Sequence, residues 1–333
     1  MKKLAPSLKL AFKFALVSAL LYFLSQKGFL SLSATKRAFS RWEYVGPGMG
    51  CLVVTAILAI YRWYVLLSAQ GIRLGISRIL QLTFVGSFFN IALPGAVSGD
   101  VIKAIYVAKE IQGRRAHSLS SILFDRVAGV SALILVSGVA LLMSLASPAG
   151  ERLLQTVGFF VLAATAFVVV FFGYLFIVKE DRDPVLALCR RLEQRIPRVG
   201  SITRIYEGIR TYHHERGAIV VSLAVSVIIH LLVIVSFVFF SLALGEDHLQ
   251  PLSLCVIVPL GLLVTAIPVM PAGVGTGHVA FSWLFMQIGS ERGADTFSLF
   301  VLFQLLQGIF GGLIYLRFKS QATALGIDLA AKR

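Results

Sequence analysis

Five long apolar segments dominate the sequence and limit the folds that are open to it. They lie near residues 45–68, 118–147, 153–178, 217–244 and 296–317. An α-helix rises about 1.5 Å per residue, so each segment is long enough to cross roughly 30 Å of hydrocarbon. Backbone groups inside a bilayer must bond within the protein, which leaves helices or closed barrels. Segments of this length favour helices, and we predict an all-α integral membrane protein.

A sixth segment, residues 8–26, is predicted to be the first transmembrane helix, giving about six full spans. Lys9 and Lys13 lie in its first turns, from which their long side chains reach the interface. A cleaved signal peptide is the alternative, but the segment has no persuasive small-residue cleavage site. Composition agrees with a membrane protein, because 57% of the residues are hydrophobic and 14% are charged. The soluble averages are about 45–50% and 25%.

Two further apolar stretches are interrupted by proline and glycine. Residues 90–100 read NIALPGAVSGD, and residues 267–278 read IPVMPAGVGTGH. Proline removes a backbone donor and glycine weakens a helix, so neither stretch is predicted to be continuous helix. Paired interruptions in the two halves of a chain indicate the substrate site of a transporter. The predicted hinge residues are Pro94, Gly95, Pro271 and Gly273.

The interruptions are predicted to form two broken re-entrant hairpins, over about 79–112 and 252–288. The first enters from the cytoplasmic side and the second from the outer side, which is the arrangement that an inverted repeat produces. The chain is then a single membrane domain, residues 1–333, with its first half at about 8–178 and its second at about 217–318. In a competing arrangement, one or both hairpins are pairs of short spans. Helical periodicity does not separate the two.

Lysine and arginine are distributed unevenly across this topology. With a cytoplasmic N-terminus, the cytoplasmic segments hold 23 of the 31 Lys and Arg residues and the outer segments hold six. Because Lys/Arg counts in short loops set orientation, both termini are predicted to be cytoplasmic, in a bacterial or archaeal inner membrane. The net charge of +15 is then largely a property of the inner face. It suits anionic lipids there, and no nucleic-acid motif accompanies it.

Residues 179–216 form the predicted cytoplasmic linker between the halves. Apolar residues such as Ile202, Ile205 and Ile209 recur at helical spacing with arginines between them, and Pro197 divides the segment. Short basic amphipathic helices on the inner membrane surface fit this pattern. A regulatory or partner-binding role is the alternative to a plain connector.

Four charged residues are predicted at membrane depth: Arg62, Asp100, Asp125 and Arg126. Charges there are costly, usually paired, and often mark a substrate pathway. The rise of a helix places Arg62, Asp125 and Arg126 in one layer, and the tip of the first hairpin can bring Asp100 toward it. The alternative is a structural Asp–Arg network that locks helices together. For His230 the structural role is favoured, because one neutral imidazole needs a single partner.

Each interruption is followed by a predicted half-helix, one opening at about Ser98 and the other at about Gly275. Free N–H groups and the positive end of the helix dipole make such an N-terminus suited to phosphate. Lys103 and Arg126 would reinforce that site, while the aspartates of the layer would meet a cationic headgroup or the arginines. Ser98 or Asp100 can also act as an N-cap, and capping and binding are compatible.

Signatures of catalysis and of metal binding are not found. The sequence has no Walker loop, and its cysteines, Cys51, Cys189 and Cys255, form neither a CxxC pair nor a disulfide framework. The His213-His214 pair has no ligand-spaced Cys or carboxylate. We therefore predict no enzyme activity, no metal and no other cofactor.

The motifs resemble those of the transmembrane domain of the lysylphosphatidylglycerol synthase/flippase family. They are Asn90, Leu93-Pro94-Gly95, Ser98-Gly99-Asp100, Lys103, Asp125-Arg126 and the later run Pro271–Gly275. The resemblance covers roughly residues 10–318. Two positions depart from it: His278 stands where an acidic residue is expected, and Asp125 where Glu is commoner. The chain ends soon after its last helix, so the resemblance implies lipid translocation and not aminoacyl transfer.

These observations together predict a protein that flips a phospholipid or polyprenyl-phosphate-linked lipid between the leaflets of the cytoplasmic membrane. The predicted substrate-binding residues are Arg62, Asn90, Ser98, Gly99, Asp100, Lys103, Asp125, Arg126, Gly275, Thr276, Gly277 and His278. The alternative is a non-transporting accessory or scaffold protein that binds a lipid or cell-envelope enzyme through its basic inner face.

Overall fold

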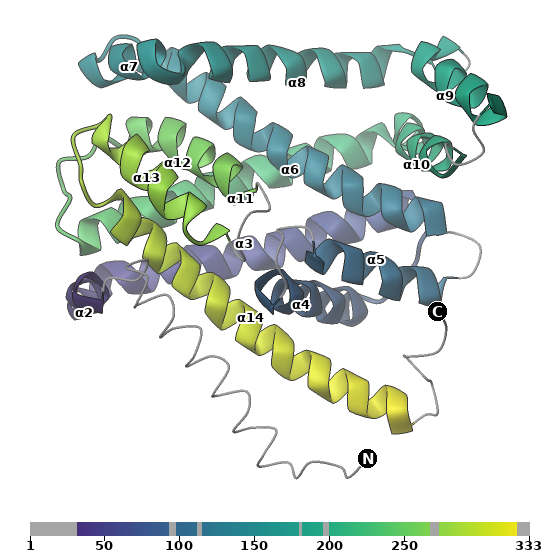
Figure 1. The fold of residues 1–333 in the computed structure, drawn as a ribbon, viewed down its shortest axis with the longest axis horizontal. Coiled ribbons are helices and arrows are strands. Elements are labelled where there is room, and N and C mark those ends of the chain that lie inside the picture. Colours follow the sequence, from purple (N-terminus) through teal and green to yellow (C-terminus); the bar gives the residue numbers. More distant parts are fainter. Residues whose placement is uncertain are drawn as a thin grey trace.

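The computed structural model describes residues 32–92, 98–111, 115–179, 182–195, 200–266 and 273–324. Within these ranges the chain is helical, with no strand (Figure 1). Five helices are long and apolar enough to cross a membrane: Trp42–Ala69, Ala116–Ser144, Pro148–Ile177, Arg216–Ala243 and Gly293–Arg317. They confirm the all-helical architecture and coincide with the five predicted segments. The predicted helix at 8–26 lies outside the described residues.

The centre of the bundle is built by α3 (Trp42–Ala69) and α11 (Arg216–Ala243), which run against each other along much of their length. Gly48 of α3 permits the close approach, because a Cβ there would lie 2.6 Å from the ring of Phe240 on α11. Phe237 and Phe240 are fully buried at this contact. Between lipid-embedded helices, such fitting of large side chains against small ones is a main source of attraction.

A glycine face joins the last helix, α14 (Gly293–Ala324), to α4 (Ile76–Ala92). A Cβ on Gly311 would lie 1.9 Å from the carbonyl oxygen of Phe84, and one on Gly308 would lie 2.2 Å from the side chain of Ile91. Only small residues let two backbones come this close. The α14 face that contacts α4 is thereby fixed.

Two pairs of shorter helices lie at opposite ends of the bundle. The first pair is α4 with α5 (Ser98–Glu110), and the second is α12 (Pro251–Thr265) with α13 (Thr276–Met286). In Figure 1 the α4–α5 pair lies toward the end that carries α10, and the α12–α13 pair toward the end that carries α7. Both pairs are broken at the predicted interruptions. The hinge residues Pro94, Gly95 and Pro271 lie outside the described residues.

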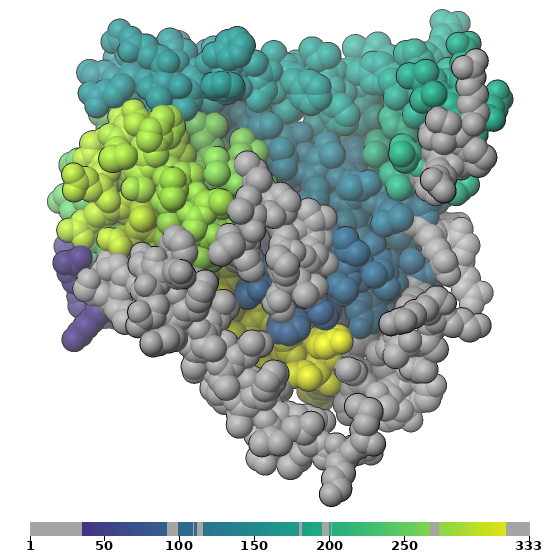
Figure 2. Space-filling model, viewed as in Figure 1, coloured from purple at the N-terminus to yellow at the C-terminus, as the bar shows by residue number. Residues whose placement is uncertain are grey.

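One span lies at the edge of the molecule, apart from the centre (Figures 1 and 2). It consists of α7 (Pro148–Leu153), the π-helical turn η1 (Leu154–Gly158) and α8 (Phe159–Ile177), and α8 packs on α6 (Arg115–Ser144). Gly138 of α6 allows that contact, since a Cβ there would lie 2.3 Å from the hydroxyl of Thr165. Phe159 and Phe167 are 79% and 69% exposed, as expected of side chains that face lipid.

Smaller helices complete the fold. A short helix, α2 (Leu32–Ser40), precedes α3 and contacts α11 and α14. The linker contains α9 (Pro184–Arg195), α10 (Gly200–Arg210) and the 3₁₀ turn η4 (Thr211–His213). Two short helices divided at Pro197 were predicted for this segment.

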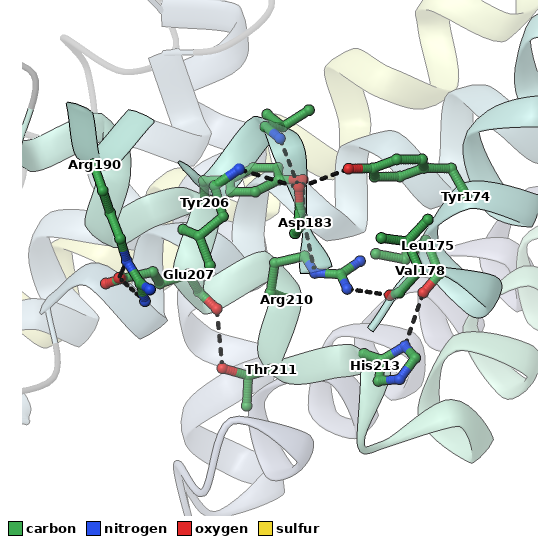
Figure 3. A network of polar contacts seen from close by, with 12 residues as sticks. Tyr174, Leu175, Val178, Asp183, Arg190, Tyr206, Glu207, Arg210, Thr211 and His213 are labelled. Atoms are coloured by element: carbon green, nitrogen blue, oxygen red, sulfur yellow. Dashed lines mark hydrogen bonds and ion pairs between the residues drawn. The ribbon is translucent and has the colours of Figure 1, made fainter. Parts of the chain in front are cut away.

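A buried ion pair ties the linker helices to the end of α8 (Figure 3). The Asp183 carboxylate lies 3.0 Å from Nε of Arg210, and both side chains are fully buried. Asp183 also accepts hydrogen bonds from the hydroxyls of Tyr174 and Tyr206 at 2.6 and 2.9 Å. It caps α9 by accepting a further bond from the Val185 N–H at 2.8 Å. One carboxylate therefore connects α8, α9 and α10.

These contacts also set the charge state of Asp183. Burial alone would raise the pKa of its carboxyl. Hydrogen bonds from Tyr174, the Leu186 N–H and Tyr206, together with the charge of Arg210, outweigh burial and hold the pKa below its usual value. A depressed pKa in the folded state stabilises the fold at pH values above the unfolded-state value of about 3.9. That stabilisation is lost as the pH falls through the folded-state pKa.

We expect Asp183→Asn to lower the free energy of unfolding by ~3 kcal/mol, because it leaves a buried arginine without its counter-charge. Thermal unfolding of the purified protein in detergent, followed by circular dichroism, measures the change. Glu207→Gln is the matched control. It breaks the more exposed Arg190–Glu207 pair and should cost at most about 1 kcal/mol. Equal losses in the two variants would contradict the anchoring role of Asp183.

Candidate functional site

The first interruption ends in a tight crossing of α4 and α5. A Cβ on Gly99 would lie 2.0 Å from the carbonyl oxygen of Gly86, so the two backbones are in direct contact. Beside this crossing, the N–H of Gly99 donates to Oδ1 of Asn90 at 2.7 Å. Asn90 thus satisfies one of the N–H groups that begin α5, a role for which the sequence suggested Ser98 or Asp100. The side chain of Ser98 is outside the described set.

Two cationic side chains converge on the carboxylate of Asp100, in the first turn of α5. Arg126 of α6 bonds to its Oδ2 through Nε, and Nζ of Lys103 lies 2.8 Å from its Oδ1. The same Nζ lies 4.8 Å from the centre of the Trp63 ring on α3, within range of a cation–π contact. The side chains of Asp100 and Lys103 are 6% and 12% exposed, but that of Arg126 is 43% exposed.

A second ion pair lies beside the first but faces the centre of the bundle. Nε of Arg62 on α3 donates to Oδ1 of Asp125 on α6 at 2.7 Å, and Nη1 donates to the Ser226 hydroxyl on α11 at 2.7 Å. Gly129 makes room for the guanidinium, because a Cβ there would lie 3.2 Å from Nη1. Both charged side chains are largely buried, at 11% and 14% exposure. This pair fastens α3, α6 and α11 together.

His230, for which a structural role was favoured, lies next to that pair. Its Nε2 is 2.9 Å from the carbonyl oxygen of Gly129, so it joins α11 to α6. The contact uses one ring nitrogen, in line with the expectation of a single partner.

The second interruption leads into α13 through two glycines with left-handed backbone, Gly273 at φ 68° and Gly275 at φ 85°. The N–H of Gly275 donates to Nδ1 of His278 at 3.3 Å, and Nε2 of His278 is 3.1 Å from the hydroxyl of Ser298 on α14. His278 is 6% exposed. A Cβ on Gly277 would lie 2.4 Å from the ring of Phe297. His278 and Gly277 therefore pack against α14, while the Thr276 hydroxyl donates to the carbonyl oxygen of Gly273 at 3.2 Å.

The predicted site residues are thus divided among three places. The hairpin cluster consists of Asn90, Gly99, Asp100, Lys103 and Arg126. The central pair consists of Arg62 and Asp125. The third group lies at the start of α13 and consists of Gly275, Thr276, Gly277 and His278. Arg62, Asp125 and Arg126 were predicted to share a layer. In the structure Arg62 pairs with Asp125, and Arg126 pairs with Asp100. Among the residues that the structure describes, no three His, Cys, Asp or Glu side chains gather as metal ligands.

Several contributors were not predicted from the sequence: Gly86, Trp63, Ser226, Ser298 and Asp183. The first four act through contacts between distant segments, which short motifs do not reveal. Asp183 did carry a local signal, because an Asp followed by Pro184 is typical of an N-cap and the first position of a helix.

Comparison with known proteins places the chain in a family. The family model described as "Lysylphosphatidylglycerol synthase TM region" matches residues 10–314. The chain belongs to this family. It is also similar to a UPF0104 membrane protein of Pyrococcus horikoshii, with 23% identity over 273 residues that cover 77% of this chain and 80% of the relative. No solved structure matches it.

Membership of the lysylphosphatidylglycerol synthase transmembrane-region family confirms the resemblance carried by the motifs. With the five apolar helices, it identifies the chain as a multi-pass membrane protein. The matched range includes all three groups of site residues and both broken helix pairs.

We expect Gly99→Ala to destabilise the protein by ~1–3 kcal/mol, because the added methyl group forces α5 away from Gly86 and strains a packed contact. Thermal unfolding in detergent measures the effect. Gly50→Ala on α3 is the control, since a Cβ there meets nothing within 4 Å. That variant should be neutral or up to about 1 kcal/mol more stable, as alanine favours helix. A Gly99→Ala protein as stable as the Gly50→Ala protein would show that the crossing is loose.

Proposed function

We propose that the chain is a transporter, not an enzyme, and that it flips a phospholipid or other lipid-linked phosphate between the leaflets of the cytoplasmic membrane. The observation that carries the proposal is the hairpin cluster, in which Lys103 and Arg126 both contact the carboxylate of Asp100. Both side chains carry the charged donors that bind phosphate groups in proteins. Arg126 is the member that would reach such a group, since 43% of its side chain is exposed.

The depth of the cluster supports this proposal. Arg126 lies ten residues after Ala116, where the span begins, so it is ~15 Å along the helix. A partly exposed charge at such depth is costly and is found where a polar pathway or a ligand receives it. Asp100 then holds Arg126 and Lys103 in place and can meet a cationic headgroup. The buried Arg62–Asp125 pair supports the cluster from the centre of the bundle.

The broken helix pairs fit a transporter in their arrangement. We propose that α4–α5 and α12–α13 are re-entrant hairpins that enter from the cytoplasmic and outer sides, as in an inverted repeat. Their places toward opposite ends of the bundle in Figure 1 support this proposal. Backbone that breaks at membrane depth requires a protein-lined or watery setting, which a substrate pathway provides.

The linker would lie at the cytoplasmic surface, with both termini on that side. On α9, Leu188 and Leu192 are 56% and 39% exposed, and Arg190 and Arg191 lie between them in sequence. An exposed apolar stripe with arginines alongside suits contact with anionic lipids.

We expect Arg126→Gln to reduce lipid translocation at least tenfold while leaving the protein folded, because Asp100 keeps Lys103 as its counter-ion. Liposomes with a fluorescent phospholipid in both leaflets receive a membrane-impermeant quencher from outside. Loss of the inner-leaflet signal then reports translocation.

Arg78→Gln is the matched control for this assay. It removes an arginine from the ion pair with Glu110, near the far ends of α4 and α5, and should leave translocation at the wild-type rate. Equal rates for wild type and Arg126→Gln would reject the hairpin cluster as the pathway. Rates no faster than in empty liposomes would favour the accessory-protein alternative.

The orientation leads to a separate expectation for cysteine labelling. In a Cys51→Ser, Cys255→Ser background, Cys189 on α9 should react with an impermeant maleimide only from the cytoplasmic side. His248→Cys, whose position follows α11 and carries a side chain 58% exposed, should react from outside in intact cells. The reverse pattern would overturn the assignment of sides.

A further inference from the structure

A groove of about 790 Å³ separates the edge span from the second broken helix pair. Its walls are formed by Val157 and Phe160 on one side, and by Leu263, Val279 and Trp283 of α12 and α13 on the other. In Figures 1 and 2, α12 and α13 lie next to α7 and α8 along this edge. Apart from the polar side chain of Thr276 at the start of α13, its walls are apolar side chains and Gly275.

The groove stays open because each of its walls is packed against a different helix. The α8 wall is fixed to α6 at the contact of Gly138 with Thr165. The α13 wall is fixed to α14, through the ring of Phe297 against Gly277 and the bond of His278 to Ser298. Neither wall is free to close on the other without losing these contacts. The space between them is therefore a built feature of the fold.

We infer that this groove binds one acyl chain of a membrane lipid. Phe160 and Val279 at its rim are 72% and 69% exposed, and Trp283 is 43% exposed, so the groove opens on the same face as the lipid-facing side of α8. The α8 part of that span is apolar, and the span is long enough to cross the membrane. Hydrocarbon chains surround such a helix, whereas an apolar groove is a poor site for water.

The size of the groove agrees with this occupant. Ligand sites commonly measure about 300–1,000 Å³ and bury most of an apolar ligand. The inference rests on the groove and not on the proposed transport, because none of the hairpin-cluster residues lines it. It adds a place for the apolar part of a lipid between α8 and the second broken helix pair.

Trp283 supplies a direct signal for occupancy. In a Trp42→Phe protein the remaining tryptophans are Trp283 at the groove and Trp63, which is 1% exposed and serves as a shielded reference. The detergent-solubilised full chain is titrated with phosphatidylglycerol whose acyl chains carry bromine, a short-range quencher of tryptophan. We expect quenching that saturates at about one lipid per protein. Unlabelled phosphatidylglycerol should reverse it, and a soluble glycerophosphate headgroup should not.

Ala280→Phe, at a lining position, should fill the groove and weaken saturable quenching at least fivefold. Val170→Phe is the matched control, because it adds the same ring to an exposed position of α8 that does not line the groove. Arg126→Gln, which is expected to lose translocation while staying folded, should leave the quenching unchanged, which separates this inference from the transport proposal.

Three results would overturn the acyl-chain site. The first is quenching that does not saturate and is equal in the Ala280→Phe and Val170→Phe proteins. Such quenching would report ordinary contact of the protein with surrounding lipid. Another is reversal by the headgroup alone. The third is absence of quenching together with a molar mass of two chains by light scattering, which would assign the groove to a second copy. If Ala280→Phe fails to fold, reversal by unlabelled lipid in the Trp42→Phe protein still decides the question.

Discussion

The carboxylate of Asp100 joins the first broken helix to the spans around it. It holds Lys103 within α5 and Arg126 of α6, and Lys103 in turn lies over Trp63 of α3. Beside it, Asn90 bonds to the N–H of Gly99, so one of the first N–H groups of α5 has a side-chain partner. Loss of Asp100 would remove the anion that Lys103 and Arg126 share. The side-chain link between α5 and α6, and with it the proposed pathway, depends on this carboxylate.

Asp125 and Arg126 are neighbours in the sequence, but their side chains contact different helices. Adjacent residues on a helix point about 100° apart. Asp125 therefore faces the bundle centre, where it accepts from Arg62, which in turn donates to Ser226. Arg126 faces α5 and keeps much of its side chain exposed. The first pair is neutral and buried, so it suits the joining of helices. The second belongs to a cluster in which two cations contact one carboxylate and one of them is partly exposed. The Arg62–Asp125 pair has the contacts of a structural network, and a substrate role for Arg126 stays a prediction.

The sequence predicted the elements better than their contacts. Hydrophobic length located the five spans, and Pro197 marked the division between α9 and α10. Charges at membrane depth also indicated that Asp100 and Arg126 belong together. The close approach of Gly86 and Gly99, the bond of His278 to Ser298 and the pairing of Asp183 with Arg210 were not predictable in this way. Each depends on which helices become neighbours, and that is decided by packing over the whole bundle. His278 was expected at a substrate site; in the structure its ring accepts from the Gly275 N–H and contacts the Ser298 hydroxyl of α14.

The two broken helix pairs differ in chemistry although they correspond in the chain. The first presents charged side chains, and the second borders an apolar groove. A lipid has the same two parts, a charged headgroup and hydrocarbon chains. Translocation requires the headgroup to cross the hydrocarbon region, where its cost is electrostatic, while the chains stay in a medium that already suits them. A protein that lowers this barrier therefore needs its charges on the headgroup path. An apolar groove beside the other broken helix pair can then hold a chain without adding to the barrier. The charged first pair and the apolar groove at the second pair therefore suit the headgroup and the acyl chain, respectively, of one lipid.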